Sequence, residues 1–102
     1  ATLALAYPPE LLAIPSPAAI FKGSPNLAAA KKFIDFLLSK EAQEVIAAEG
    51  TLPVRSDVQV PAKFNLPQPQ DALTRGIKVD YLQMIAVKEE TIKKFTDIMQ
   101  GK

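Results

Sequence analysis

The clearest pattern in this chain runs from residue 27 to residue 38, where apolar side chains fall on one side of a helical wheel. At about 100° per residue, with Phe36 at its edge, that side collects Leu27, Ala30, Phe33, Ile34, Leu37 and Leu38. The opposite side carries Lys31, Lys32 and Asp35. The apolar arc is broader than that of an ordinary surface helix. We therefore expect a helix, preceded by Asn26 as N-cap, that a sheet and a second element cover.

A second helix is expected over residues 40–49, directly after a serine break. Ser39 is a favourable N-cap residue, and Glu41 in the first turn suits the positive end of the helix dipole. Gly50 suits the left-handed position that often follows a helix. The inward face of this helix is predicted to be Ala42, Val45 and Ile46.

Only short stretches of the chain favour β-strands. Residues 3–7 form an apolar run that two prolines end, and residues 18–21 form another. Val54 or the stretch 58–60 is expected to pair briefly with another strand. The order strand, loop, helix, helix defines an α/β unit. The predicted fold class is therefore α/β, helix-rich with few strands of its own, and its sheet partners must come from a larger protein.

The two ends of this unit continue as a crossing segment and a terminal helix. Pro15 and Pro17 remove two backbone donors around Ser16, so this region is predicted to cross as extended chain. Residues 61–79 are rich in proline and lack an amphipathic period, which predicts an extended connection.

Residues 80–100 show one apolar helical stripe: Tyr81, Ile85, Ile92, Phe95 and Met99, interrupted by Lys88. Docking on its own protein fits this helix better than a coiled coil, which needs three or four uninterrupted heptads.

Composition excludes several classes of function. The 102 residues are enough for one domain at most. Twelve basic and eleven acidic residues are spread without a block of one sign, which argues against a nucleic-acid-binding surface. The absence of cysteine and histidine excludes a thiol nucleophile, a Cys/His zinc site and a serine–histidine pair within this segment. No apolar run is long enough to span a bilayer, and no signal peptide is visible.

Few residues are candidates for ligand contact. Ser16 offers a free hydroxyl on a stiff backbone, although a structural hinge is the simpler role for its segment. Tyr7 and Tyr81 are the only phenols, and a phenolate is a good ligand for ferric iron, but their spacing does not support joint ligation. Arg55 is expected to form a surface salt bridge with Asp57 rather than to bind an anion. We predict Ser16 and Tyr7 as ligand-binding residues, and no catalytic or metal-ligating residue in this segment.

The run from residue 14 to residue 58 resembles a known family. Its matching pieces are AAIFKGSPN, AAAKKFIDFLLSKEAQEVIA and GTLPVRSDV. They resemble the C-terminal part of the family 1 extracellular solute-binding proteins of bacterial ABC importers, particularly the iron(III)-binding branch. The closing helix, DYLQMIAVKEETIKKFTDIMQG, is similar to the tail of that family.

The resemblance implies a type II periplasmic-binding-protein fold, in which two lobes close over a ligand. This chain would then be its C-terminal fragment, divided into 1–11 (end of one lobe), 12–18 (hinge crossing), 19–60 (strand and helix pair of the other lobe), 61–79 (extended connection) and 80–102 (terminal helix). The adjacent tyrosines that ligate metal in iron-binding members are missing from this sequence. Iron specificity therefore transfers to no residue here.

The resemblance further implies a periplasmic or surface-anchored, non-enzymatic protein that delivers a small solute to the membrane subunits of an importer. Ferric iron is the first choice of solute for the full-length protein; sugar phosphates, thiamine and polyamines are others. Two alternatives remain: a helical interaction module acting through the terminal helix, and a small hydrolase. Because the apolar arc of residues 27–38 is so wide, we also expect self-association or a companion chain.

Overall fold

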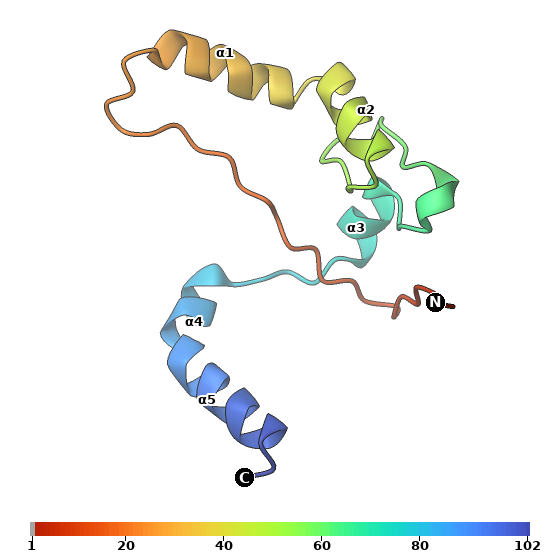
Figure 1. Ribbon diagram of the computed structural model, residues 1–102, viewed down its shortest axis with the longest axis vertical. Helices are drawn as coiled ribbons and strands as arrows, with labels where there is room; N and C mark the ends of the chain where they lie inside the picture. Colours follow the sequence, from red (N-terminus) through yellow and green to blue (C-terminus); the bar gives the residue numbers. More distant parts are fainter. Residues whose placement is uncertain (1) are drawn as a thin grey trace.

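The computed structural model describes residues 2–102, which form an open arrangement of short helices joined by extended chain (Figure 1). The helices, in chain order, are α1 (Leu27–Leu37), α2 (Lys40–Ala48), the 3₁₀ turn η1 (Ala62–Phe64), α3 (Pro69–Arg75), α4 (Tyr81–Ala86) and α5 (Lys88–Met99). α1 contacts α2 and α4 contacts α5, and no other pair of described helices is close backbone to backbone. No described helix is long and apolar enough to cross a membrane.

The predicted helix pair is confirmed. The Ser39 hydroxyl accepts a hydrogen bond from the Ala42 N–H at 3.2 Å and begins α2. Gly50 follows α2 with a φ of +81°, the left-handed conformation expected after a helix end. Asn26 precedes α1, but its side chain makes no capping hydrogen bond.

The apolar arc of α1 remains uncovered, and no residue of this helix is buried. Phe33 is 58% exposed and Leu38 is 53% exposed, while Leu27 and Phe36 are each about half exposed. The expectation that this chain alone cannot cover the arc is therefore confirmed.

The predicted strands are wrong for residues 2–102. Residues 3–7, 18–21 and 58–60 are extended or irregular, and the only bridge in the described range joins Leu11 and Gly76 in parallel. A strand needs a partner to satisfy its backbone groups, and the described chain supplies none. A two-lobed α/β fold is therefore not visible in the described chain.

Two other expectations need correction. Residues 61–79 are not extended throughout, since they contain η1 and α3. α3 begins with Pro69 at its first position, and the Asp71 carboxylate accepts from the Gln68 backbone N–H at 3.0 Å.

The terminal helix is not continuous either, because Val87, with φ −103° and ψ 6°, separates α4 from α5. α5 contains no buried residue, so it does not dock on the described chain.

A small core lies between α2 and the segment that follows it. Its most buried members are Ala42, Ala47, Val58 and Val60. The Gln68 side chain donates to the Val60 carbonyl at 3.1 Å and accepts from its N–H at 2.9 Å, which replaces the missing strand partner. Val45, predicted to face inward, is 63% exposed, and Ala47 takes its place.

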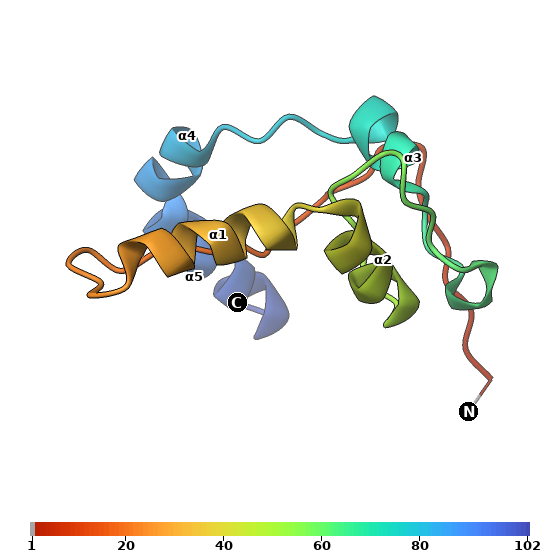
Figure 2. The same cartoon turned by 90° about the horizontal axis from the view of Figure 1, so that it is seen from above.

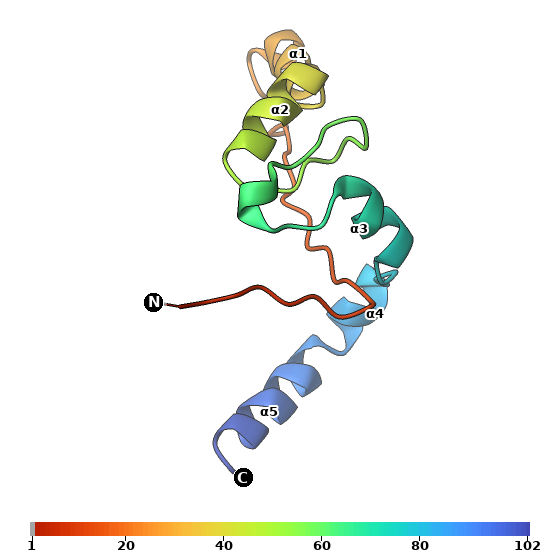
Figure 3. The ribbon, with the colours of Figure 1, turned by 90° about the vertical axis from the view of Figure 1, so that its right-hand side faces the viewer.

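The molecule is far from compact. Its radius of gyration is 18.0 Å, against about 13 Å for a globular chain of this length. The accessible surface is 8905 Å², against about 5,700 Å² for a folded monomer of 11.1 kDa. α1 and α5 lie at opposite ends of the longest axis, and the N-terminal segment projects sideways (Figures 1, 2 and 3). Much apolar surface is consequently left in contact with water.

Candidate ligand-binding groove

The N-terminal segment is held to the end of α3 by a short parallel contact. The Leu11 N–H donates to the Arg75 carbonyl at 2.8 Å, and the Ile77 N–H donates to the Leu11 carbonyl at 2.8 Å. Gly76 lies between these partners, where a Cβ would collide with the Ala72 carbonyl oxygen. A glycine at this position therefore lets the chain leave the last turn of α3 without a clash.

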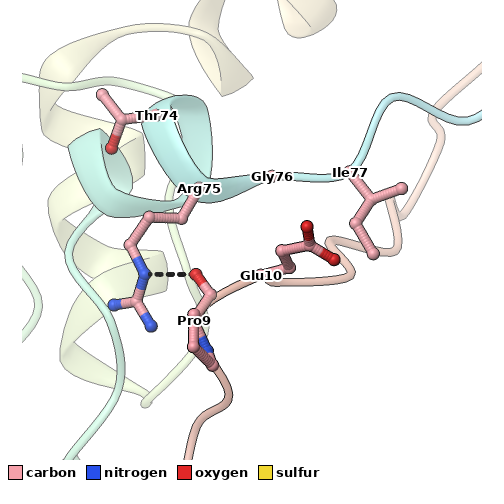
Figure 4. Close-up of a pocket in the computed structure, with 6 residues that line it drawn as sticks. All are labelled: Pro9, Glu10, Thr74, Arg75, Gly76 and Ile77. Carbon is pink, nitrogen blue, oxygen red and sulfur yellow. Dashed lines mark hydrogen bonds between the residues drawn. The ribbon is translucent and has the colours of Figure 1, made fainter.

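The Arg75 side chain strengthens this contact. Its guanidinium donates to the Pro9 carbonyl at 2.9 Å (Figure 4). It also donates to the Pro8 carbonyl at 2.7 Å. Since Pro8 and Pro9 cannot donate from their own nitrogens, this run is bound through its carbonyls alone. Beside the guanidinium, Glu10 and Ile77 border a recess of about 430 Å³ (Figure 4).

A larger groove, of about 1300 Å³, runs along the other side of the N-terminal segment. Its walls come from three parts of the chain: residues 7–16, the stretch from Gln43 to Val54, and residues 66–73; Tyr81 also contributes. Most lining side chains are apolar, as in small-molecule sites generally. The hydrogen bonds from Arg75 to the Pro8 and Pro9 carbonyls anchor the N-terminal wall, and α2 contributes to another wall.

The structure brings both predicted site residues to this groove. Tyr7, 39% exposed, lies at one end of the N-terminal wall, and Ser16, also exposed, lies farther along the same wall. Both are accessible to a solute entering the groove. The two phenols of the chain, Tyr7 and Tyr81, also line the same groove despite their separation in sequence.

Besides Gln43, three further polar side chains line the groove and were missed by the sequence analysis: Glu10, Glu49 and Thr51. No local motif marks them, because they reach the groove only through the folding of α2 and the anchoring at Leu11. Within residues 2–102, no three acidic, histidine or cysteine residues gather closely enough to hold a metal ion.

A buried amide supports the α2 wall. Gln43, only 5% exposed, donates to the Leu37 carbonyl at 2.6 Å and accepts from the Val54 N–H at 2.8 Å. It therefore joins the end of α1 to the segment that closes the groove. The sequence analysis missed this residue too.

Arg55 forms the predicted salt bridge. Its Nε and Nη2 each lie 2.8 Å from one oxygen of Asp57, and its Nη1 donates to the Leu38 carbonyl at 3.2 Å. The hydrogen bond from Arg55 lowers the pKa of Asp57 below its ordinary value. Because this guanidinium is occupied, it is poorly placed to bind a separate anion.

Comparison with known proteins identifies the family to which the chain belongs. No solved structure matches the chain. The family model of the bacterial extracellular solute-binding proteins matches residues 2–84, which include every groove residue from Tyr7 to Tyr81. The match ends before α5. Since it covers well over half of the sequence, the chain belongs to the family of bacterial extracellular solute-binding proteins.

Proposed function

We propose that this chain contributes to a substrate-binding protein that delivers a small solute to the membrane subunits of an ABC importer. The family match over residues 2–84 carries this proposal. The role is binding without catalysis, and the location is the periplasm or the outer surface of the cell. The groove supports it, since its apolar walls contain a few polar groups that orient a solute.

The chain is proposed to be the C-terminal part of the binding protein. Residues 1–11 then end one lobe, residues 12–18 form the crossing, and residues 19–60 belong to the other lobe. The large uncovered surface of α1 supports this division, because a preceding lobe would cover it. Residues 61–79 with α3, and the helices that follow, return toward the first lobe.

Ferric iron is the proposed solute of the full-length binding protein, and Tyr7 and Ser16 are the proposed ligand contacts that this chain contributes. A phenolate is a hard, anionic oxygen ligand that suits a hard cation such as Fe³⁺. The support is the resemblance to the iron(III)-binding branch and the position of Tyr7 in the groove. Tyr81 lines the same groove.

Titration of the 102-residue chain with ferric nitrilotriacetate tests this assignment. Binding should raise the thermal midpoint and produce a visible phenolate-to-iron charge-transfer band; at a free concentration 100 times Kd, the stabilisation is about 2.7 kcal/mol. Tyr7→Phe should weaken the band, Tyr7→Phe combined with Tyr81→Phe should remove it, and Ser16→Ala should weaken binding. Ser56→Ala, an exposed serine outside the groove, should change neither.

Thiamine, a sugar phosphate and spermidine serve as comparison solutes. Stabilisation by one of these, without a response to iron, would keep the solute-binding role and reject iron. Binding that is unaffected by both Tyr7→Phe and Ser16→Ala would place the site elsewhere. No response to any solute would contradict a binding site built from this chain alone.

The exposed stripe of α5 favours a second candidate function, an interaction module. Ile92, Phe95 and Met99 are 53%, 63% and 70% exposed, and α5 lies beyond the residues that match the family. An immobilised peptide of residues 80–100 should then retain a defined partner. The same peptide carrying Phe95→Asp should not retain it, and equal retention by both would reject the module.

A further inference from the structure

The charged side chains that line the large groove are all of one sign. Among the described lining residues they are Glu10, from the N-terminal wall, and Glu49, which follows α2; no lysine or arginine lines the groove. The whole chain contains twelve basic and eleven acidic residues, so composition does not explain this imbalance. Both glutamates are exposed, and neither forms an ion pair within residues 2–102. Their carboxylates are therefore available to a solute.

Two arginines lie near the groove but direct their charge at other groups. Arg75 borders the smaller recess beside Glu10, and its guanidinium donates to the Pro8 and Pro9 carbonyls (Figure 4). Arg55 follows the lining residue Val54 and is paired with Asp57 at 2.8 Å. Because both guanidiniums already bind protein oxygens, an anionic solute in the groove would find no basic side chain to hold it.

The backbone around the groove offers more acceptors than donors. Five lining residues are prolines, which have no N–H to donate: Pro8, Pro15, Pro53, Pro67 and Pro69. Residues 12–16 of the N-terminal wall take part in no hydrogen bond within the described chain, so their carbonyls have no protein donor. Carboxylates and carbonyls accept hydrogen bonds, whereas an ammonium group only donates them. The groove is therefore better matched to a cation than to an anion.

The position of Glu49 adds to the negative charge of the groove. Glu49 directly follows the last residue of α2, and no basic residue lies in the last turn of that helix. The C-terminal end of a helix carries a partial negative charge, equivalent to about half an elementary charge, which favours a nearby cation. Val45, Ile46, Glu49 and Gly50 all line the groove, so this end of α2 borders it.

We propose that the groove selects a solute of positive charge, and that Glu10 and Glu49 are the residues that set this selectivity. The inference rests on the proposed solute-binding function and narrows its substrate class. Ferric iron and an organic polyamine belong to that class, and a sugar phosphate does not. Because both carboxylates are exposed, the selectivity is strongest at low ionic strength, where screening is weak.

Isothermal titration calorimetry of the 102-residue chain tests this selectivity with spermidine, ferric nitrilotriacetate and glucose 6-phosphate. At least one of the two cations should bind, and glucose 6-phosphate should not. Raising the salt concentration from about 20 mM to about 200 mM should weaken the binding of the cation. The double substitution Glu10→Gln and Glu49→Gln should raise the Kd for the cation by about 10-fold, the loss of two exposed ion pairs.

Glu41→Gln is the matched control, since Glu41 is an exposed glutamate of α2 that does not line the groove. It should leave the Kd unchanged. Glutamine is close to glutamate in size and Glu10 and Glu49 are exposed, so far-UV circular dichroism of the double variant should match that of the parent chain. If it does not, the salt dependence of cation binding to the parent chain decides, and its absence would overturn the proposal.

The outcomes separate this inference from the function on which it rests. Tighter binding of glucose 6-phosphate than of either cation would overturn the charge selectivity and keep the solute-binding role. Cation binding that is unaffected by the double substitution would overturn the assignment to Glu10 and Glu49. No response to any of the three solutes would contradict a binding site built from this chain, and the inference would fall with it.

Discussion

The Gln43 side chain on α2 joins three segments of the chain through two hydrogen bonds, one to the end of α1 and one to Val54. Its amide group satisfies the Leu37 carbonyl and the Val54 N–H in a part-buried setting. Gln43→Ala leaves both groups without a partner, and each costs about 1–3 kcal/mol. We expect the free energy of unfolding, measured by urea denaturation, to fall by at least about 2 kcal/mol.

Gln59→Ala is the matched control, since Gln59 is exposed between two buried valines. It should change the unfolding free energy by less than about 0.5 kcal/mol. Equal effects of the two substitutions would show that the Gln43 bridge adds nothing to stability.

Gly50 and Gly23 share the same backbone conformation, with a φ of +81°. Alanine at either position should lower the free energy of unfolding by about 1–2 kcal/mol, because its Cβ is strained in the left-handed conformation. At Gly50 a Cβ would also lie 2.8 Å from the Phe64 ring, whereas at Gly23 it would meet nothing within 4 Å. Gly50→Ala should therefore destabilise the chain more than Gly23→Ala, by about 1–3 kcal/mol in thermal or urea unfolding. Equal losses would mean that the ring moves aside freely.

The Arg55–Asp57 pair makes stability depend on pH in the acid range. Hydrogen bonding by Arg55 lowers the pKa of Asp57 in the folded chain, so the unfolded chain binds this proton more readily. The contribution is present above the unfolded pKa, about 3.9, and is lost as the pH falls through the lower folded value. Carboxyl-detected NMR should show the low pKa. Arg55→Met should raise it toward the ordinary value, and Lys31→Met should leave it unchanged.

Local signals correctly predicted the Ser39 cap, Gly50 and the Arg55–Asp57 salt bridge, but the Asn26 cap was wrong and the longer-range contacts of Gln43 were not predicted. Ser39 and Gly50 act on atoms a few positions away, so their roles follow from sequence alone. Gln43 reaches Val54, eleven positions later, and no local pattern specifies that contact. The groove shows the same division: Tyr7 and Ser16 were candidates by chemistry, whereas Glu10 and Glu49 reach it only through tertiary structure.

At the scale of elements, Arg75 at the end of α3 anchors the N-terminal segment. It makes two hydrogen bonds to the Pro8 and Pro9 carbonyls, which the single ammonium of lysine reproduces poorly. Arg75→Lys should therefore accelerate hydrogen exchange at the Leu11 and Ile77 amides by about 5- to 10-fold, the effect of one hydrogen bond. Lys78→Arg, at an exposed neighbouring position, should not alter it.

The periodic elements were predictable, and the aperiodic ones were not. α1 and α2 follow clear 3.6-residue patterns with caps, and both form as expected. α3 has only seven residues and its proline content obscured it, although Pro69 followed by Asp71 is a helix-start signal. The strands failed for another reason: their formation depends on partners that residues 2–102 do not contain.

The whole molecule combines a small core with long unsupported stretches. Residues 12–20 take part in no backbone hydrogen bond within the described chain, and nearly all of them are exposed. Limited proteolysis with a protease of broad specificity should therefore cut this stretch before it cuts α1 or α2. Mass spectrometry of the first fragments checks this expectation. Initial cleavage within α2 would contradict it.

The Leu11–Gly76 contact encloses most of the chain in a single loop. Closing a flexible loop of that length costs about 4 kcal/mol of chain entropy, whereas each backbone hydrogen bond contributes only about 1 kcal/mol. Two backbone hydrogen bonds and the Arg75 side chain only roughly offset this entropy, so the contact should be of low stability. We expect it to open and reclose while the helix pair stays folded, so that the N-terminal arm swings free and the groove transiently loses the wall that residues 7–16 supply.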